Sequence, residues 1–205
     1  MLIKMKTEYQ KFFPDNFTLE TPRVLLRLMT PQDYDAFLPL TKDTEIWKFF
    51  VNDLSTDEGL TNWMEKLLAE RQQEVRMPFT VIDKHTNEIV GSTSFLNISF
   101  YDKRLEIGST WLGTPFIGTG VNRQAKFALL SFAFEVMKIE RVEIKTDNLN
   151  ERSKAALLKV GMKPEGVLRS HSVMHDNRRR DTIYFSIIRS EWEERKRSFF
   201  SEMLF

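Results

Sequence analysis

Cysteine is absent from this sequence of 205 residues, and only three residues are histidine. The absence of cysteine excludes disulfide bonds, thiolate catalysis and zinc sites with cysteine ligands. The histidines, at positions 85, 171 and 175, are too scattered to indicate a metal centre, so we expect no metal. Thirty basic and 29 acidic residues leave a formal net charge of +1, which provides no global attraction to nucleic acid or to a membrane.

Long hydrophobic runs are also absent. No apolar stretch reaches the length of a transmembrane helix, and residues 1–6 lack the apolar core of a signal peptide. Hydrophobic residues make up 41% of the chain and include 17 Phe, which indicates a packed core. We therefore expect a single cytoplasmic domain over residues 1–205. It would have an N-terminal extension at 1–18 that packs on the surface and a C-terminal helix at 190–205.

The spacing of apolar residues predicts a chain in which strands and helices are intermixed. Strands are expected at residues 21–28, 79–83, 88–95, 105–112, 141–146, 162–168 and 182–188. Helices are expected at residues 31–40, 55–68, 150–160 and 190–205, and a long helix follows Gly120. Ser190 is the expected cap of the last helix, and segments 97–103 and 170–181 are expected to be loops.

The stretch from Leu105 to Met137 combines a β-prone segment, a turn that contains glycine and a helix. Gly118 and Gly120 precede the helix, whose apolar residues recur at the spacing of a buried face. Glycine lets backbone N–H groups approach an anion, and the N-terminus of a helix adds partial positive charge. The pattern predicts a phosphate-bearing ligand, although a tight strand-to-helix turn without any ligand explains the glycines equally well.

The spacing of these glycines does not fit two common phosphate motifs. A dinucleotide fingerprint requires glycine three residues after Gly120, where the chain has Arg123. A P-loop that begins at Gly113 requires lysine after Gly118, where the chain has Thr119. What remains is a short G-x-G at the start of a helix, which alone does not identify the ligand.

Several further patterns follow one another along the chain. They are T-P-R at 21–23, D-K-H-T-N-E-I-V-G at 83–91, E-I-G at 106–108 with W-L at 111–112, G-T-G at 118–120, and D-N-L-N-E-R-S at 147–153 followed by G-M at 161–162. Together they resemble the GCN5-related N-acetyltransferase (GNAT) superfamily, especially the RimJ/RimL-like branch that acetylates the N-termini of ribosomal proteins. Two departures exist: Pro115 replaces the usual Gln or Arg before the glycines, and Met162 replaces the commoner Phe.

The resemblance implies an α+β fold of three layers, in which a central mixed sheet is splayed to admit CoA and is flanked by helices. It implies acetyl-CoA as cosubstrate, no metal, and an acceptor amine on a protein N-terminus or a small molecule. No membrane or nucleic-acid partner is expected, and the chain would be a monomer or a homodimer. The residues expected to bind CoA are Trp111, Leu112, Phe116, Ile117, Gly118, Thr119, Gly120, Val121, Asn122 and Asn150.

The implied reaction is direct attack of a neutral primary amine on the thioester. Glu106 is the candidate general base, directly or through one water, and the alternative is a solvated strand carboxylate. Ser153 is the candidate proton donor to the leaving thiolate, and the alternative is a first-turn residue with a local hydrogen bond. Asn150 would both cap the helix and contact the pantetheine arm. A backbone N–H near Trp111 would polarise the thioester oxygen.

The residues that bind the acceptor are less well defined by the sequence. The candidates are Trp47, Phe49, Phe50, Trp63, Tyr101 and the segment 170–181, although the aromatic side chains, above all Trp63, also suit a core. Arg178, Arg179 and Arg180 would form a solvated face, attract an acidic peptide or bind the 3′-phosphate of CoA. A second hypothesis for the function is a CoA- or peptide-binding module without catalysis, which would need neither Glu106 nor Ser153.

Overall fold

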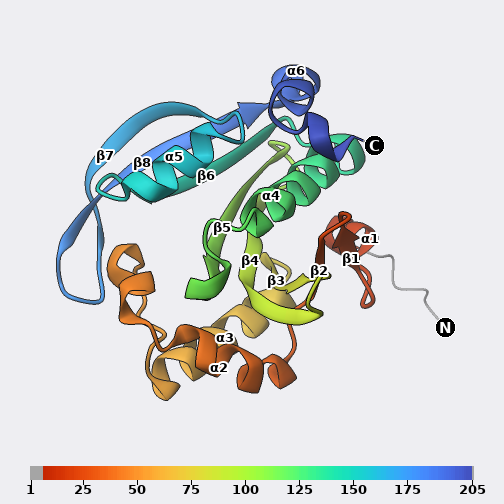
Figure 1. Cartoon of the computed structure of the whole chain (residues 1–205). Helices are drawn as coiled ribbons and strands as arrows, with labels where there is room; N and C mark the ends of the chain where they lie inside the picture. Colours follow the sequence, from red (N-terminus) through yellow and green to blue (C-terminus); the bar gives the residue numbers. More distant parts are fainter. Residues whose placement is uncertain (1–6, 205) are drawn as a thin grey trace.

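A mixed sheet of eight strands forms the centre of the computed structural model, which describes residues 7–204 (Figure 1). Residues 1–6 of the expected N-terminal extension, and residue 205, lie outside the described part. The strands are β1 (Thr18–Glu20), β2 (Val24–Leu28), β3 (Arg76–Asp83), β4 (Glu88–Ser99), β5 (Arg104–Leu112), β6 (Arg141–Asp147), β7 (Lys163–Val173) and β8 (Arg179–Ile188). Their order is β1-β2-β3-β4-β5-β6-β8-β7, and β5–β6 is the parallel pair in it.

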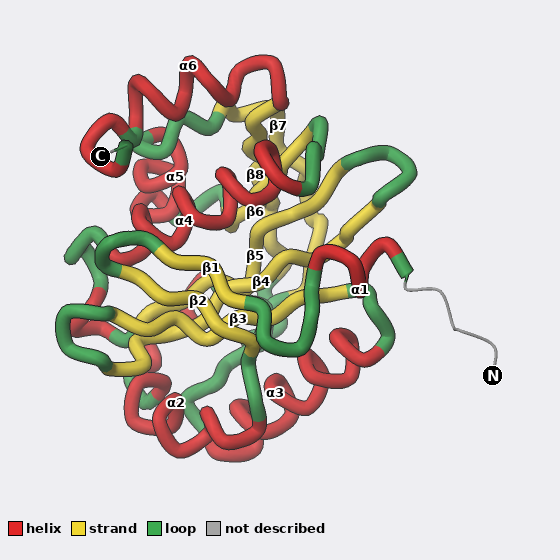
Figure 2. The backbone as a smooth tube through the Cα atoms, turned by 90° about the vertical axis from the view of Figure 1, so that its right-hand side faces the viewer, coloured by secondary structure: helices red, strands yellow, loops and turns green. Residues whose placement is uncertain are grey.

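Helices cover both faces of this sheet (Figure 2). They are α1 (Glu8–Phe12), α2 (Tyr34–Thr41), α3 (Asp57–Gln72), α4 (Val121–Ser131), α5 (Glu151–Leu158) and α6 (Arg189–Phe199). Helices α2 and α3 lie on one face, and α4, α5 and α6 lie on the other. Within residues 7–204, no helix combines the length and the apolar character needed to cross a membrane.

The predicted α+β class with a mixed sheet between helices is confirmed, while several element ends differ. The expected loop 170–181 is largely strand, because β7 and β8 pair as far as Val173 and Arg179. Strand β4 likewise continues to Ser99, through part of the expected loop 97–103. Ser190 lies inside the first turn of α6 instead of capping it, because β8 leads directly into the helix and Ile188 takes the N-cap position.

The two faces of the sheet carry separate apolar cores. The larger core lies on the side of α4 and contains Phe79 and Phe95, both fully buried. The second core lies on the side of α2 and α3, where Trp111 of β5 packs against Phe37 and Trp47 with ring centroids 5.2 and 5.5 Å apart. Strand β5 contributes to both cores, since successive side chains on a strand point to opposite faces.

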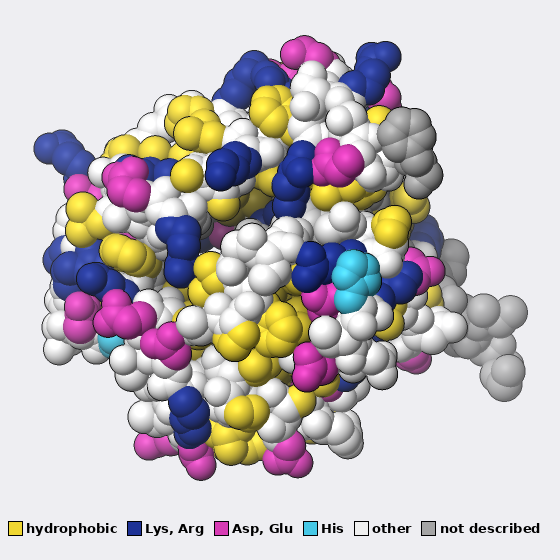
Figure 3. Space-filling model, in the orientation of Figure 1, with side chains coloured by type: hydrophobic (Ala, Val, Ile, Leu, Met, Phe, Trp, Pro, Cys, Tyr) yellow, Lys and Arg dark blue, Asp and Glu magenta, His cyan; other side chains and the backbone are white. Residues whose placement is uncertain are grey.

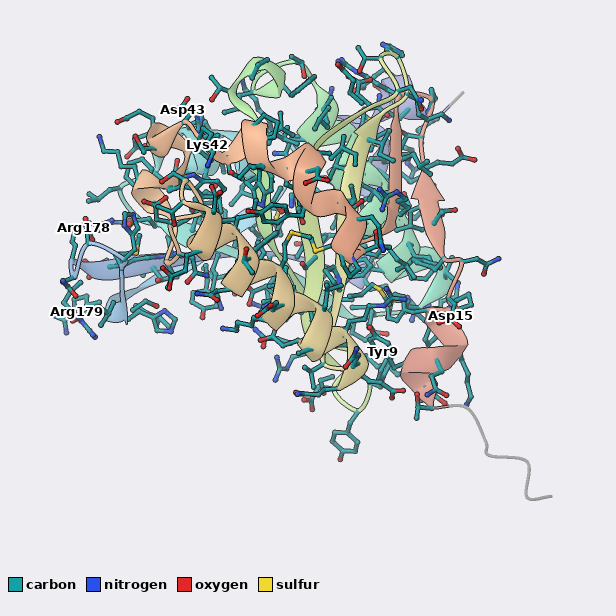
Figure 4. The ribbon with its side chains drawn as sticks, turned by 90° about the horizontal axis from the view of Figure 1, so that it is seen from below. Tyr9, Asp15, Lys42, Asp43, Arg178 and Arg179 are labelled. Atoms are coloured by element: carbon teal, nitrogen blue, oxygen red, sulfur yellow. The ribbon has the colours of Figure 1, made fainter. Side chains whose placement is uncertain are left out.

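The N-terminal segment packs into the larger core instead of on the surface. Tyr9 of α1 is buried, and its hydroxyl donates a hydrogen bond of 2.5 Å to the carbonyl oxygen of Arg76 at the start of β3 (Figure 4). Phe13 is 5% exposed, and its ring centroid lies 6.2 Å from that of Phe95 and 5.9 Å from that of Phe132. Local periodicity does not indicate this cluster because its members are far apart in the sequence.

Replacing Phe13 tests whether this segment belongs to the core. We expect Phe13→Ala to lower the free energy of unfolding by about 3–5 kcal/mol, because it removes a buried ring and leaves a cavity. Tyr101→Ala is the matched control, since Tyr101 is 96% exposed and its loss should change stability by less than about 0.5 kcal/mol. Urea unfolding measures both variants, and equal stabilities would contradict a core role for the N-terminal segment.

Candidate active site

Strands β5 and β6 separate after a short stretch of pairing. Their parallel ladder covers three residue pairs, from Arg104 opposite Arg141 to Glu106 opposite Glu143. Beyond these pairs the two strands diverge, which Figure 1 shows as a widening angle between them. The edge of β5 from Ile107 onward therefore has no strand partner on this side, and an extended ligand can pair with it.

A β-bulge in β5 lies beside this opening. The register between β4 and β5 shifts at Ser92–Ser94, so Ser109 and Thr110 share one partner residue on β4. Ser109 has a φ of +49°, in the left-handed region that residues other than glycine seldom adopt. Bulges redirect side chains and backbone groups and are common next to active sites. Here Thr110 of the bulge points to the α4 side, and the next residue, Trp111, points to the α2–α3 side.

A cleft of about 620 Å³ passes through the opening between β5 and β6. Asn122 and Ser153, from α4 and α5, line one side of it. Trp47 and Phe50, which belong to the aromatic group near α2 and α3, line the other side. The volume is in the range of pockets that hold small molecules and cofactors. Because the cleft reaches both faces of the sheet, two ligands can meet in it from opposite sides.

The glycine loop forms one wall of the cleft. Gly118 and Gly120 line it and have φ of +80° and +93°, which favour glycine. A Cβ atom added at Gly118 would meet no heavy atom within 4 Å, so there is free space beside the loop backbone. Gly120 is the N-cap of α4 and provides no capping side chain, which leaves the first N–H groups of the helix available to an anion.

Arg23, the residue before β2, anchors this loop. Its guanidinium donates a hydrogen bond to the carbonyl oxygen of Thr119 and three more, of 3.4, 3.2 and 2.8 Å, to the carboxylate of Asp83 of β3. The hydrogen bonds from Arg23 hold the pKa of the buried Asp83 carboxyl below its usual range. The loop is therefore tied to the sheet through a buried carboxylate.

Seven of the ten residues expected to bind CoA line the cleft. They are Trp111, Leu112, Ile117, Gly118, Gly120, Asn122 and Asn150. Phe116, Thr119 and Val121 do not line it. The side chain of Val121 is fully buried in the core, that of Phe116 packs partly against the core, and the hydroxyl of Thr119 donates to the Phe116 carbonyl oxygen. The side chains of Phe116 and Val121 thus contribute to packing, and that of Thr119 makes a local hydrogen bond.

Glu106 is a buried carboxylate inside the cleft and not a solvated one. It is 2% exposed and lines the cleft. Asn97 Nδ2 on β4 donates a hydrogen bond of 2.8 Å to Glu106 Oε2, and Lys145 Nζ on β6 lies 3.0 Å from the same oxygen. Strands on both sides of β5 therefore hold the carboxylate in place. Neither partner is apparent from the sequence, because strand pairing alone brings Asn97 and Lys145 next to Glu106.

Asn150 and Ser153 occupy the start of α5. Asn150 is the N-cap, and its Oδ1 accepts a hydrogen bond of 3.0 Å from the backbone N–H of Ser153. The capping role is therefore observed, and both residues also line the cleft. The helix cap uses the backbone of Ser153, so its hydroxyl is not needed for this cap.

The cleft is strongly basic although the whole chain is nearly neutral. Its charged lining residues are one acid, Glu106, and six bases: Arg123, Lys126, Lys145, Arg152, Lys159 and Arg180. Lys126 is the least expected of them, because it is 3% exposed and burial lowers its pKa to about 7. A lysine between apolar residues of a buried helix face was the sequence signal that could have found it. Such a lining suits an anionic ligand.

The three consecutive arginines have different environments. Arg178 Nη2 lies 2.5 Å from Oδ2 of the buried Asp147. Arg179 donates a hydrogen bond of 2.8 Å to Ser170 Oγ near the tip of the β7–β8 hairpin (Figure 4). Basic side chains gather at this tip in Figure 3. Arg180 is 8% exposed and lines the cleft, and burial lowers its pKa. The three do not form one solvated face.

Only some of the residues expected to bind the acceptor line the cleft. Tyr101 lies in the turn between β4 and β5 and does not line the cleft, because that turn is at the other end of β5 from the bulge. Trp47 and Trp63 are buried in the second core, yet both line the cleft together with Phe49 and Phe50. From segment 170–181, Arg180 is the residue that reaches the cleft.

Comparison with known proteins identifies the family. A family model described as an acetyltransferase (GNAT) domain matches residues 23–163, and the chain therefore belongs to the GNAT acetyltransferase family. The protein p20 of Bacillus licheniformis, named as an uncharacterized N-acetyltransferase, is 28% identical over 179 residues, which cover 85% of this chain and 98% of p20. YdaF of Bacillus subtilis strain 168, provisionally named as a ribosomal N-acetyltransferase, is 25% identical over 179 residues, which cover 84% of this chain and 95% of YdaF.

A solved structure supports the same assignment. A protein of T. thermophilus that is provisionally named as an acetyltransferase is 33% identical and superimposes with a TM-score of 0.82, covering 94% of this chain and 98% of that one. The superfamily expected from the sequence motifs is confirmed, and the similarity to YdaF agrees with the expected resemblance to the RimJ/RimL-like branch.

Substitution of Gly120 tests whether the glycine loop and the free N–H groups at the start of α4, which we call the anion cradle, bind phosphate. We expect Gly120→Asp to bind CoA at least about tenfold more weakly than Gly120→Asn, because a carboxylate would face the phosphates at the helix N-terminus. Asn is the matched control, since it has nearly the same size and tolerates positive φ but carries no charge. Calorimetric titration with CoA measures both variants, and equal affinities in two folded proteins would contradict phosphate binding at this loop.

Proposed function

We propose that this protein transfers the acetyl group of acetyl-CoA to a primary amine by direct attack of the amine on the thioester. The observation that carries the proposal is the cleft through the split sheet, which has an anion cradle at its wall and the buried carboxylate of Glu106 inside. Access from both faces would let the cosubstrate and the acceptor meet without competing for one entrance.

Acetyl-CoA would enter from the side of α4 and α5. Its phosphates would contact the glycine loop, where free N–H groups and the basic Arg123 and Arg152 favour negative charge. The pantetheine arm would pair with the free edge of β5, as an added strand does. The thioester would then lie near the bulge, where a backbone N–H can polarise its oxygen.

Glu106 would act on the acceptor amine as the general base. Its carboxylate is fixed by Asn97 and Lys145, so it can accept a proton from the amine, directly or through a water, without reorienting. Trp111 Nε1, which is buried without a hydrogen-bond partner among the described residues, lines the same cleft and could donate to a ligand. Ser153 would pass a proton to the departing sulfur from the α5 side.

The acceptor would be a protein N-terminus or a small amine. An α-amine has a reference pKa near 8 and a lysine near 10.4, so an α-amine supplies more of the neutral nucleophile at neutral pH. YdaF is named as a ribosomal N-acetyltransferase, which supports testing ribosomal components among the acceptors. Phe49 and Phe50, which line the cleft and are partly exposed, would contact the residue that carries the amine.

A panel of amines with acetyl-CoA tests this function. The panel should contain peptides with free N-termini, polyamines and amino sugars, and release of free CoA thiol is the readout. We expect catalytic turnover with at least one class of primary amine, and none with the same compounds after acetylation. Tight CoA binding without turnover on any amine would instead support a CoA-binding module without catalysis.

Glu106→Gln separates base catalysis from a folding defect. We expect kcat/KM to fall by about 10²–10⁴-fold near neutral pH, because the amide keeps the shape but accepts no proton. Activity should recover partly at high pH, where the amine loses its proton unaided. Glu143→Gln is the control, since Glu143 is the register partner of Glu106 on β6 and does not line the cleft. Wild-type kcat/KM in the Glu106 variant across the pH range would remove this residue from the mechanism.

Ser153→Ala tests the proposed route of the proton to sulfur. We expect turnover to fall by about tenfold or more while CoA affinity stays within about threefold, because one hydroxyl is lost and no phosphate contact changes. The helix cap should persist, since Asn150 binds the backbone N–H of residue 153. Circular dichroism checks the fold, and unchanged single-turnover rates would show that another group protonates the thiolate.

A further inference from the structure

A buried lysine in the cleft lacks an acidic partner. Lys126 is in the second turn of α4, is 3% exposed and lines the cleft. Its Nζ donates one hydrogen bond of 2.8 Å, to Thr110 Oγ1, and Lys126 forms no ion pair with any residue from 7 to 204. An ammonium has three donors, so further N–H groups remain for a ligand. A buried cation without a counter-charge is costly, and an anion in the cleft would relieve that cost.

Lys126 and Glu106 lie on opposite faces of β5. Ile107 packs in the core on the α4 side, so the adjacent Glu106 points to the other face, toward Lys145. Within the bulge, Thr110 contacts Lys126 of α4 and therefore points to the α4 side. The cleft between β5 and β6 connects the two charged groups. An acetyl group held between them would have the amine on one side and the sulfur on the other.

The position of Lys126 along α4 indicates that it would contact the sulfur of acetyl-CoA and not the phosphates. It is six positions after the N-cap Gly120, which corresponds to about 9 Å along a helix. Phosphates at the glycine loop would therefore lie near the start of the helix, and Lys126 would lie deeper in the cleft. Its contact residue, Thr110, belongs to the bulge beside which the thioester is placed in the proposed function.

We propose that the Lys126 ammonium lies against the sulfur of acetyl-CoA and stabilises the negative charge that develops there as the thiolate leaves. This role rests on the proposed function. The amine nitrogen forms a bond to the acetyl carbon, the carbon–sulfur bond breaks, and its electron pair goes to sulfur. Glu106 removes one proton from the amine and releases it to solvent. Ser153 passes one proton to sulfur and regains one from solvent, and Lys126 keeps its proton throughout.

The protonation state of Lys126 gives the role a pH dependence. Burial lowers its pKa to about 7, and a neighbouring thiolate would favour the charged form and act in the opposite direction. The other charged groups that line the cleft are Glu106 on β5, Arg123 on α4, Lys145 on β6, Arg152 and Lys159 near α5, and Arg180 on β8. The stabilisation is present while Lys126 is protonated and is lost as the pH rises through its pKa.

The test is a spectroscopic titration of the thiol of CoA bound to the protein, with ultraviolet absorbance of the thiolate as the signal. In the wild type, the thiol of bound CoA should titrate at least about one pH unit below that of free CoA, because a cation favours the thiolate. In Lys126→Met, which keeps the length but not the charge, this shift should disappear. We expect kcat to fall about 100-fold, with KM for acetyl-CoA changed less than about threefold.

The control and the outcomes separate this role from a structural one. Lys138→Met removes the same charge at an exposed position outside the cleft and should leave the thiol titration as in the wild type. A titration in the wild type that matches free CoA would overturn the proposal without any variant, as would a full shift in folded Lys126→Met. If the wild type bound no CoA, the proposed function itself would fail. Should Lys126→Met not fold, the same thiol titration in Lys126→Gln and in the wild type tests the proposal, and a full shift in Lys126→Gln would overturn it.

Discussion

The separation of β5 from β6 is the constraint on which the rest of the site depends. The parallel ladder ends after three residue pairs, so the next backbone groups of β5 must find partners other than a strand. The sheet tolerates this break because β5 stays paired with β4 and β6 stays paired with β8. Helices α4 and α5 begin beside the opening, which places the glycine loop and Asn150 at one cleft. The cleft of this GNAT-family chain thus forms where strand pairing breaks.

Charge is distributed unevenly around this opening. The whole chain is close to neutral, whereas the cleft is lined by six basic residues and one acidic residue. Burial of isolated charges is costly, so each buried group needs a partner or a ligand. Glu106 has Lys145, and Asp83 has Arg23. Lys126 has a hydroxyl alone, and the buried Arg180 has no ion-pair partner among residues 7–204, so both are buried charges in the cleft that an anionic ligand would stabilise.

The two faces of β5 give the proposed reaction a direction. The α4 face carries the glycine loop, Lys126 and the start of α5, which suit an anionic cosubstrate and a departing sulfur. The α2–α3 face carries Glu106 and aromatic side chains such as Phe50, which suit an amine and the group attached to it. The bulge at Ser109 lies between these two regions. In the proposed reaction, such an arrangement would hold both reactants in position before the bond forms, which is a large part of catalysis.

The sequence by itself determined the order of the strands and helices from residue 21 onward, the strand–glycine–helix unit and the cap at Asn150, whereas it did not predict α1 and β1. These features depend on neighbouring residues, through alternation, helical spacing and local hydrogen bonds. Only the tertiary structure decided that Phe13 joins the core, that three adjacent arginines take separate environments and that Lys126 has no counter-charge. Each of these depends on contacts between segments distant in sequence, and the bulge at Ser109 depends on register between two strands. A local sequence pattern does not predict such contacts, because the same pattern of residues can pack against many different segments.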